Sequence, residues 1–208
     1  MFLNRIAIAP GLDYCPGFLP PEDQAAVRDE VLAILAQAPL FRPRMPRTGQ
    51  PFSVRMSNCG PLGWVSDESG YRYQRMHPET GRPWPPMPKC LMDAWATLAP
   101  EAPVPEACLI NFYDAKAKMG LHQDRDEQEL SAPVVSLSLG CSASFRLGGR
   151  KRNDKTRAFL LNSGDALVLG GPARLAFHGV DRILSGSSAF LPQGGRINLT
   201  LRRVTAAP

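Results

Sequence analysis

The sequence predicts a mainly β fold of the α+β class, with a sandwich or barrel of short strands after a helical N-terminal segment. From residue 107 onward, short apolar or alternating segments are separated by turn-forming clusters such as Gly148-Gly149 and Gly170-Gly171-Pro172. Many short strands at close spacing are typical of a sandwich or barrel. We expect strands at 107–113, 133–139, 144–147, 157–161, 165–169, 174–180 and 196–203.

The chain before these strands predicts two helices on either side of a loop-rich region. A helix over 21–38 begins at a Pro-Pro pair, carries apolar residues at helical spacing and ends before another proline, as proline favours helix starts and prevents their continuation. A second helix is expected at about 88–99. Between them, residues 40–88 are rich in arginine, proline, glycine and aromatic residues, which favours short strands joined by loops.

Length and composition restrict the class of protein. The 208 residues fit one large domain, or a core with a substantial extension. Hydrophobic residues form 44% of the chain and charged residues 21%, so we expect a packed core and no extensive disorder. No run of 18 apolar residues is present, which predicts no transmembrane helix. Without a secretory signal or a C-x-x-C pair, we expect a cytoplasmic protein with reduced thiols and no membrane partner. We also expect a monomer.

The charge balance favours a nucleic-acid partner but does not require one. The net charge is +5, and 19 of the 24 basic residues are arginine. Arginine side chains match phosphate geometry, although a high genomic G+C content would enrich arginine equally well. The stretch before residue 76 contains Arg42, Arg44, Arg47, Arg55, Arg72 and Arg75.

Two of the three histidines of the chain belong to a pattern that suits a metal ion. His122 and Asp124 are two residues apart, and His178 follows 54 residues after the aspartate. On an extended segment, residues i and i+2 point to the same face, so His122 and Asp124 can reach one ion together. A histidine from a distant strand would complete a set of two histidines and one carboxylate, which is typical of non-haem Fe(II) oxygenases.

The last expected strand alternates strictly between polar and aliphatic residues. Its polar face carries Arg196, Asn198, Thr200 and Arg202. On an ordinary sandwich this face would lie in solvent; alternatively, its two arginines could hold the ends of a small dicarboxylate. In the strand at 107–113, Asn111 and Tyr113 share a face and offer hydrogen-bonding groups suited to carboxylate oxygens.

Eight segments carry a family resemblance. They are 57–64, 70–73, 83–88, 109–113 (LINFY), 121–126 (LHQDRD), 149–154 (GRKRND), 177–180 (FHGV) and 196–202 (RINLTLR). In order and spacing, from about residue 40 to 203, they resemble the bacterial AlkB family of Fe(II)- and 2-oxoglutarate-dependent dioxygenases. The three upstream segments resemble the nucleotide-recognition lid of that family.

The resemblance implies a double-stranded β-helix (jelly roll) core with a helical N-terminal extension and a nucleotide-recognition lid. We expect three parts: an N-terminal extension with a helix at 1–40, the lid and its supporting helix at 41–105, and the dioxygenase core at 106–208.

The resemblance also implies a role for each site residue. Fe(II) would be bound by His122, Asp124 and His178. The co-substrate 2-oxoglutarate would be held by Asn111, Tyr113, Arg196, Asn198 and Arg202. The damaged base would contact Trp64, Tyr71, Asp126 and Arg152. Two apolar positions depart from the best-known bacterial pattern: Leu169 replaces a tryptophan and Ala176 a phenylalanine, which would widen the base pocket or change the access of O2.

The implied activity is oxidative demethylation of N1-methyladenine and N3-methylcytosine in DNA. Decarboxylation of 2-oxoglutarate by O2 would be coupled to hydroxylation of the N-alkyl group and release of formaldehyde. We expect single-stranded DNA as the preferred partner, with double-stranded DNA or RNA as alternatives. The same chemistry on tRNA or a protein is a second hypothesis, and a non-catalytic cupin-like binding protein is a third.

Overall fold

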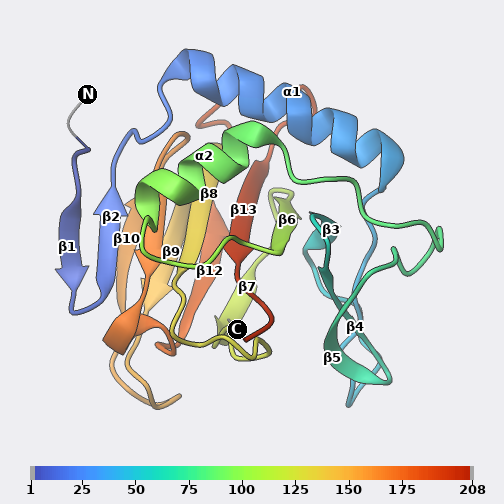
Figure 1. The fold of residues 1–208 in the computed structure, drawn as a ribbon. Helices are drawn as coiled ribbons and strands as arrows, with labels where there is room; N and C mark the ends of the chain where they lie inside the picture. Colours follow the sequence, from blue (N-terminus) through green and yellow to red (C-terminus); the bar gives the residue numbers. More distant parts are fainter. Residues whose placement is uncertain (1–2, 207–208) are drawn as a thin grey trace.

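Two antiparallel β-sheets face each other and form the body of the protein (Figure 1). The computed structural model describes residues 3–206. The larger sheet has seven strands in the order β1-β2-β11-β8-β13-β6-β3, and the smaller has four in the order β10-β9-β12-β7. This arrangement confirms the expected jelly-roll core.

The strands are short and all their pairings are antiparallel. The larger sheet consists of β1 (Ile6–Ala9), β2 (Leu12–Cys15), β3 (Arg55–Cys59), β6 (Ala107–Tyr113), β8 (Val134–Gly140), β11 (Ala166–Leu169) and β13 (Arg196–Arg202). The smaller sheet consists of β7 (Met119–His122), β9 (Ala143–Leu147), β10 (Arg157–Leu161) and β12 (His178–Ile183). A separate hairpin is formed by β4 (Gly63–Asp67) and β5 (Gly70–Gln74).

Both helices, α1 (Pro21–Gln37) and α2 (Lys89–Leu98), cover the outer face of the larger sheet (Figure 1). Their buried residues pack with the aliphatic face of β13, which includes Ile197, Leu199 and Leu201. A second apolar cluster lies on the other side of the larger sheet, between the two sheets. Because β13 is buried on both faces, its polar residues point into the space between the sheets instead of into solvent.

Most of the expected elements are confirmed, within one or two residues at their ends. Both helices form as expected, and the strands at 107–113 and 157–161 have the expected bounds. The strand expected at 174–180 begins later than expected: β12 covers His178–Ile183, and residues 174–177 follow a short 3-10 helix, η1 (Gly171–Ala173). Arg174 has helical backbone angles (φ −53, ψ −36), and its buried side chain bonds to neighbouring loops, so this segment cannot extend.

The β4–β5 hairpin, which falls within the expected lid, rests on a small aromatic cluster. Trp84 donates its indole N–H to the carbonyl of Gln74, at the end of β5, over 2.9 Å. The Trp84 ring packs against Phe41 and the buried His77. Through this cluster the hairpin contacts two segments: the one after α1, which carries Phe41, and the one before α2, which carries Trp84.

The expected division of the chain into 1–40, 41–105 and 106–208 stays a prediction. Residues 1–2 and 207–208 lie outside the described range. In the described part of the chain, no helix combines the length and the apolar character that crossing a membrane requires.

Candidate active site

His122 and His178 face each other across a pair of neighbouring strands. His122 is the last residue of β7 and His178 the first of β12, and the two are register partners. Each ring bonds through Nδ1 to the carbonyl two residues before it: His122 to Gly120 at 2.9 Å and His178 to Ala176 at 3.0 Å. A carbonyl oxygen can only accept, so Nδ1 carries the proton and Nε2 is left free to bind a metal ion.

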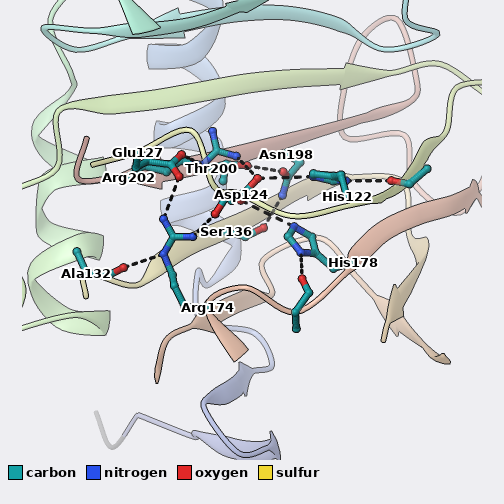
Figure 2. Close-up of polar contacts among 12 residues, drawn as sticks. His122, Asp124, Glu127, Ala132, Ser136, Arg174, His178, Asn198, Thr200 and Arg202 are labelled. Carbon is teal, nitrogen blue, oxygen red and sulfur yellow. Dashed lines mark hydrogen bonds and ion pairs between the residues drawn. The ribbon is translucent and has the colours of Figure 1, made fainter. Parts of the chain in front are cut away.

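Asp124 completes the set from the loop that follows β7. Its Oδ1 lies 3.6 Å from Nε2 of His122, and its Oδ2 lies 3.8 Å from Nε2 of His178. The three ligand atoms all lie within 4.8 Å of one another. Asp124 lies just beyond the strand, since β7 ends at His122, and the three side chains converge as expected (Figure 2).

The surroundings keep these groups in the protonation states that a metal requires. Burial raises the pKa of Asp124, but the nearby charges of Arg202, His178 and His122 outweigh it and hold the pKa well below its usual range. Burial, with the charge of His122, lowers the pKa of His178 to about 4. At neutral pH the site offers a carboxylate and a neutral imidazole, which are the ligating forms.

The donor set fits Fe(II). Two imidazole nitrogens and one carboxylate oxygen leave open positions on the ion for further ligands, and they also suit Mn(II), Co(II) and Ni(II). The buried Oδ2 of Asp124 has no hydrogen-bond partner among residues 3–206, and a bound cation would satisfy it. Within the same range this is the one group of three or more histidine, cysteine or acidic residues so closely placed.

The polar faces of β13 and β6 line a narrow inner cavity of about 60 Å³ beside this group. Arg196 is the register partner of Tyr113, and Asn198 is the partner of Asn111. The cavity also touches His122, Asp124 and His178. The structure thus brings together all five residues that the sequence assigned to 2-oxoglutarate: Asn111, Tyr113, Arg196, Asn198 and Arg202.

Arg196 brings a positive charge to this cavity with neutral partners around it. Its guanidinium donates to the carbonyls of Cys141 and Leu161 and to the hydroxyl of Ser138. Burial lowers the pKa of Arg196 to about 10, so the group stays charged at neutral pH. Its Nε and Oδ1 of Asn111 are buried without hydrogen-bond partners among the described residues. A carboxylate ligand would pair with this charge, and 2-oxoglutarate fits the requirement.

A second, wider pocket of about 340 Å³ is also lined by His122 and Asp124. Trp64 of β4 stacks on Tyr71 of β5, with ring centroids 5.6 Å apart and planes 17° apart. The Trp64 indole donates to Oδ2 of Asp126 over 2.8 Å. Arg152 bonds to the Leu121 carbonyl at 3.3 Å. All four residues that the sequence assigned to the base therefore line this pocket: Trp64, Tyr71, Asp126 and Arg152.

The two pockets meet at the metal-binding group. His122, Asp124 and Arg202 line both of them, so a molecule in the wide pocket and one in the inner cavity would approach the same ion from two sides. Leu169 lines the inner cavity. Ala176 is buried and supplies the carbonyl that orients His178.

Three polar residues of this region were not expected from the sequence. Glu127 and Arg174 are buried and form an ion pair of 3.1 Å, and Tyr73 donates its hydroxyl to Glu127. Glu127 directly follows the resembling segment 121–126, and Tyr73 ends the segment 70–73. These positions in or beside a motif were the available signal for Glu127 and Tyr73, whereas Arg174 had none.

Comparisons with known proteins agree with this geometry. Residues 11–202 match the family model described as the 2OG-Fe(II) oxygenase superfamily. An "Alpha-ketoglutarate-dependent dioxygenase AlkB homolog" of Caulobacter vibrioides is 54% identical over 208 residues, covering 100% of this chain and 94% of that protein. The chain belongs to the AlkB family of this superfamily. The AlkB dioxygenase of Escherichia coli K12 is 44% identical over 175 residues, covering 82% of this chain and 80% of its own.

Further AlkB-family matches extend to eukaryotes. The solved structure of OsALKBH1 superimposes with a TM-score of 0.80 at 32% identity, covering 96% of this chain and 99% of that one. A protein of Arabidopsis thaliana named "DNA N(6)-methyladenine demethylase ALKBH1D" is 42% identical over 108 residues, 47% of this chain and 24% of its own. This AlkB-family protein is an Fe(II)- and 2-oxoglutarate-dependent dioxygenase, and these matches leave no support for a non-catalytic binding protein.

Proposed function

We propose that this AlkB-family dioxygenase repairs alkylated DNA by removing methyl groups from N1-methyladenine and N3-methylcytosine. The junction of the two pockets at His122 and Asp124 carries the proposal. At this junction, an alkylated base in the wide pocket and 2-oxoglutarate in the inner cavity would both lie next to one metal ion. When bound, Fe(II), 2-oxoglutarate and O2 supply an oxidation that hydroxylates the N-alkyl carbon, with release of succinate, CO2 and formaldehyde.

The first part of the proposal concerns the residues that hold the metal and the co-substrate. Fe(II) would be held by His122, Asp124 and His178. Arg202 would hold the C1 end of 2-oxoglutarate near the metal together with Asn111, and Arg196 would pair with the distal carboxylate beside Tyr113. Asn198 would support this arrangement, since its amide donates to Ser136 and to the Leu137 carbonyl and fixes the polar face of β13.

The second part concerns the base. A target base must leave its stack to reach the metal, and an aromatic face can replace the lost stacking. Trp64 offers that face from the lid, and its hydrogen bond to Asp126 fixes the orientation of the ring. Alkylation at a Watson–Crick nitrogen can place a positive charge on the base, which the carboxylate of Asp126 and the aromatic rings Trp64 and Tyr71 favour. Arg152, which lines the same pocket, is suited to a phosphate.

The third part concerns the partner and its location. Single-stranded DNA is the proposed substrate, because an unpaired base costs less to extrude and the lid carries many arginines that suit phosphates. The name of the Arabidopsis relative, a DNA demethylase, supports nucleic acid over protein. We further propose a cytoplasmic monomer in which residues 1–40, 41–105 and 106–208 form the extension, the lid and the dioxygenase core.

The site assignment is tested by product release from a single-stranded oligonucleotide containing N1-methyladenine. Succinate and formaldehyde should appear together, and both should be lost in Asp124→Ala, because that change removes one metal ligand and the partner of Arg202. Asp93→Ala is a matched control, since this carboxylate lies on α2 and pairs with Lys89 on the surface. Full product release by Asp124→Ala would refute the metal assignment. Faster turnover of methylated RNA or a methylated peptide would instead support the rival substrates.

A further inference from the structure

A network of buried charges lies directly behind the candidate metal ligands. Glu127 is buried between two arginines: Nη2 of Arg174 lies 3.1 Å from its Oε2, and Nε of Arg202 lies 3.3 Å from its Oε1. Arg202 also reaches Oδ1 of Asp124 over 2.9 Å. Figure 2 shows the resulting chain of contacts from Arg174 through Glu127 and Arg202 to Asp124. Two cations and two anions therefore share one enclosed site.

Arg174 anchors this network to the protein frame. Besides its ion pair with Glu127, it donates to the carbonyl of Ala132 over 2.9 Å and to the backbone carbonyl of Asp124. These contacts hold the loop that carries Asp124 and Glu127 against η1. Arg174 therefore fixes Oε2 of Glu127. The other oxygen, Oε1, faces Arg202 and Tyr73 of the hairpin.

The network reaches the lid through one hydroxyl. Tyr73 lies on β5, and its hydroxyl donates to Oε1 of Glu127 while accepting from Nη1 of Arg202 over 3.4 Å. Burial, outweighing the opposing charge of Arg202, raises the pKa of Tyr73 well above its usual value, so the hydroxyl keeps its proton and can donate. The hairpin that carries Trp64 and Tyr71 is therefore hydrogen-bonded to the guanidinium that the proposed function assigns to 2-oxoglutarate.

We propose that Tyr73 and Glu127 are positioning residues that transmit the position of the lid hairpin to Arg202, and so couple the binding of an alkylated nucleic acid to the binding of 2-oxoglutarate. The inference rests on the proposed function, because it takes the wide pocket and the inner cavity as the two binding sites. Arg202 lines both of them. A base under the hairpin would hold Tyr73 in place, and the Tyr73–Glu127 contact would keep Arg202 oriented toward the co-substrate.

Such coupling must be reciprocal, because the two binding events belong to one thermodynamic cycle. A nucleic acid that tightens the binding of 2-oxoglutarate is itself bound more tightly when 2-oxoglutarate is present, by the same factor. The hydroxyl of Tyr73 and the carboxylate of Glu127 are the groups whose removal should uncouple the two binding sites. Tyr73→Phe removes only the bridging hydroxyl, whereas Glu127→Gln removes the charge that holds Arg202.

The coupling is tested by calorimetric titration of 2-oxoglutarate into the full-length protein loaded with Mn(II), without O2, so that no turnover occurs. Each titration is performed with and without a saturating single-stranded oligonucleotide that contains N1-methyladenine. For the unaltered protein we expect the oligonucleotide to tighten 2-oxoglutarate binding by about fivefold or more, within the usual range of coupling between sites. Tyr73→Phe should reduce this factor to about one.

The matched control is Tyr14→Phe, which removes another hydroxyl bonded to a carboxylate, that of Asp165 at 2.7 Å; neither residue lines either pocket. In this variant the oligonucleotide should tighten 2-oxoglutarate binding by the same factor as in the unaltered protein. Glu127→Gln should weaken 2-oxoglutarate binding even without the oligonucleotide, and melting curves of all variants verify that they are folded. A factor that is unchanged in Tyr73→Phe, or absent from the unaltered protein while both ligands bind, would overturn the inference alone. Failure of the unaltered protein to bind either ligand would overturn the proposed function with it.

Discussion

At the residue scale, the two candidate histidine ligands are oriented by the same local arrangement. Each donates Nδ1–H to the carbonyl two residues earlier, which directs Nε2 toward Asp124. The identities of His122, Asp124 and His178 could be predicted, because their residue types and spacing can be recognised in the sequence. The orienting carbonyls could not, because any residue type supplies a carbonyl.

Burial of His178 predicts a stability change with pH in the metal-free protein. Its pKa is about 4 in the folded state and about 6.5 when unfolded. Between these values the unfolded chain binds a proton that the folded chain does not, so the free energy of unfolding should fall as the pH drops from about 6.5 to 4, by a few kcal/mol. Urea unfolding measured across this range tests the effect. His178→Asn should show a shallower fall; an identical fall in both proteins would contradict the assignment.

Glu127 and Arg174 show where prediction from residues fails. Acidic and basic side chains are mostly exposed in proteins, so nothing in the sequence identifies these two as buried partners. Their burial follows from the loop 124–132 folding over η1, a tertiary arrangement. Only the structure therefore reveals the link from the lid to Arg202.

At the element scale, the strict alternation of polar and aliphatic residues along β13 places three of the five residues assigned to 2-oxoglutarate on one face: Arg196, Asn198 and Arg202. The sequence predicted the strand and its polar face, but it left open whether that face met solvent or a ligand. Its neighbours decide the question, because β13 lies between β8 and β6 with helices on one side and the smaller sheet on the other. The region of the β4–β5 hairpin was expected to contain short strands joined by loops, whereas the bounds and the mutual pairing of these five-residue strands come from the structure.

The start of β4 gives a test of how the lid is held. A Cβ on Gly63 would lie 2.4 Å from the Trp84 ring and 2.8 Å from Cβ of Asn58. Gly63→Ala should therefore displace Trp84 and lower the free energy of unfolding by about 1–3 kcal/mol, as overpacking usually does. Gly120→Ala is the control, since its Cβ would meet nothing within 4 Å. Equal stability of the two variants in urea unfolding would contradict this close packing.

At the scale of the whole molecule, the larger sheet separates two apolar cores with different tasks. One core joins the helices to the sheet, and the other surrounds the candidate site between the sheets. The β-rich class and both helices could be predicted from strand spacing and helical periodicity. The order of the strands could not, because β1 and β2 join β11 from the opposite end of the chain.

This separation predicts that stability and ligand binding can be changed independently. Leu91 on α2 is fully buried against the outer face of the larger sheet. Leu91→Ala should lower the free energy of unfolding by about 2–5 kcal/mol through the cavity it leaves, yet the folded variant should bind 2-oxoglutarate with unchanged affinity. Urea unfolding and calorimetry measure the two effects. A large loss of affinity at temperatures where the variant is folded would show that the helix layer shapes the site.

We propose that this protein demethylates a base of DNA at the junction of its two pockets. The most direct test of this proposal is mass spectrometry of a single-stranded oligonucleotide with one N1-methyladenine, after incubation with the protein, Fe(II), 2-oxoglutarate and O2. We expect conversion to the mass of the unmodified oligonucleotide, with one formaldehyde and one succinate released for each lesion. An unaltered methylated oligonucleotide, from a preparation that converts 2-oxoglutarate to succinate with a methylated RNA or peptide, would contradict it.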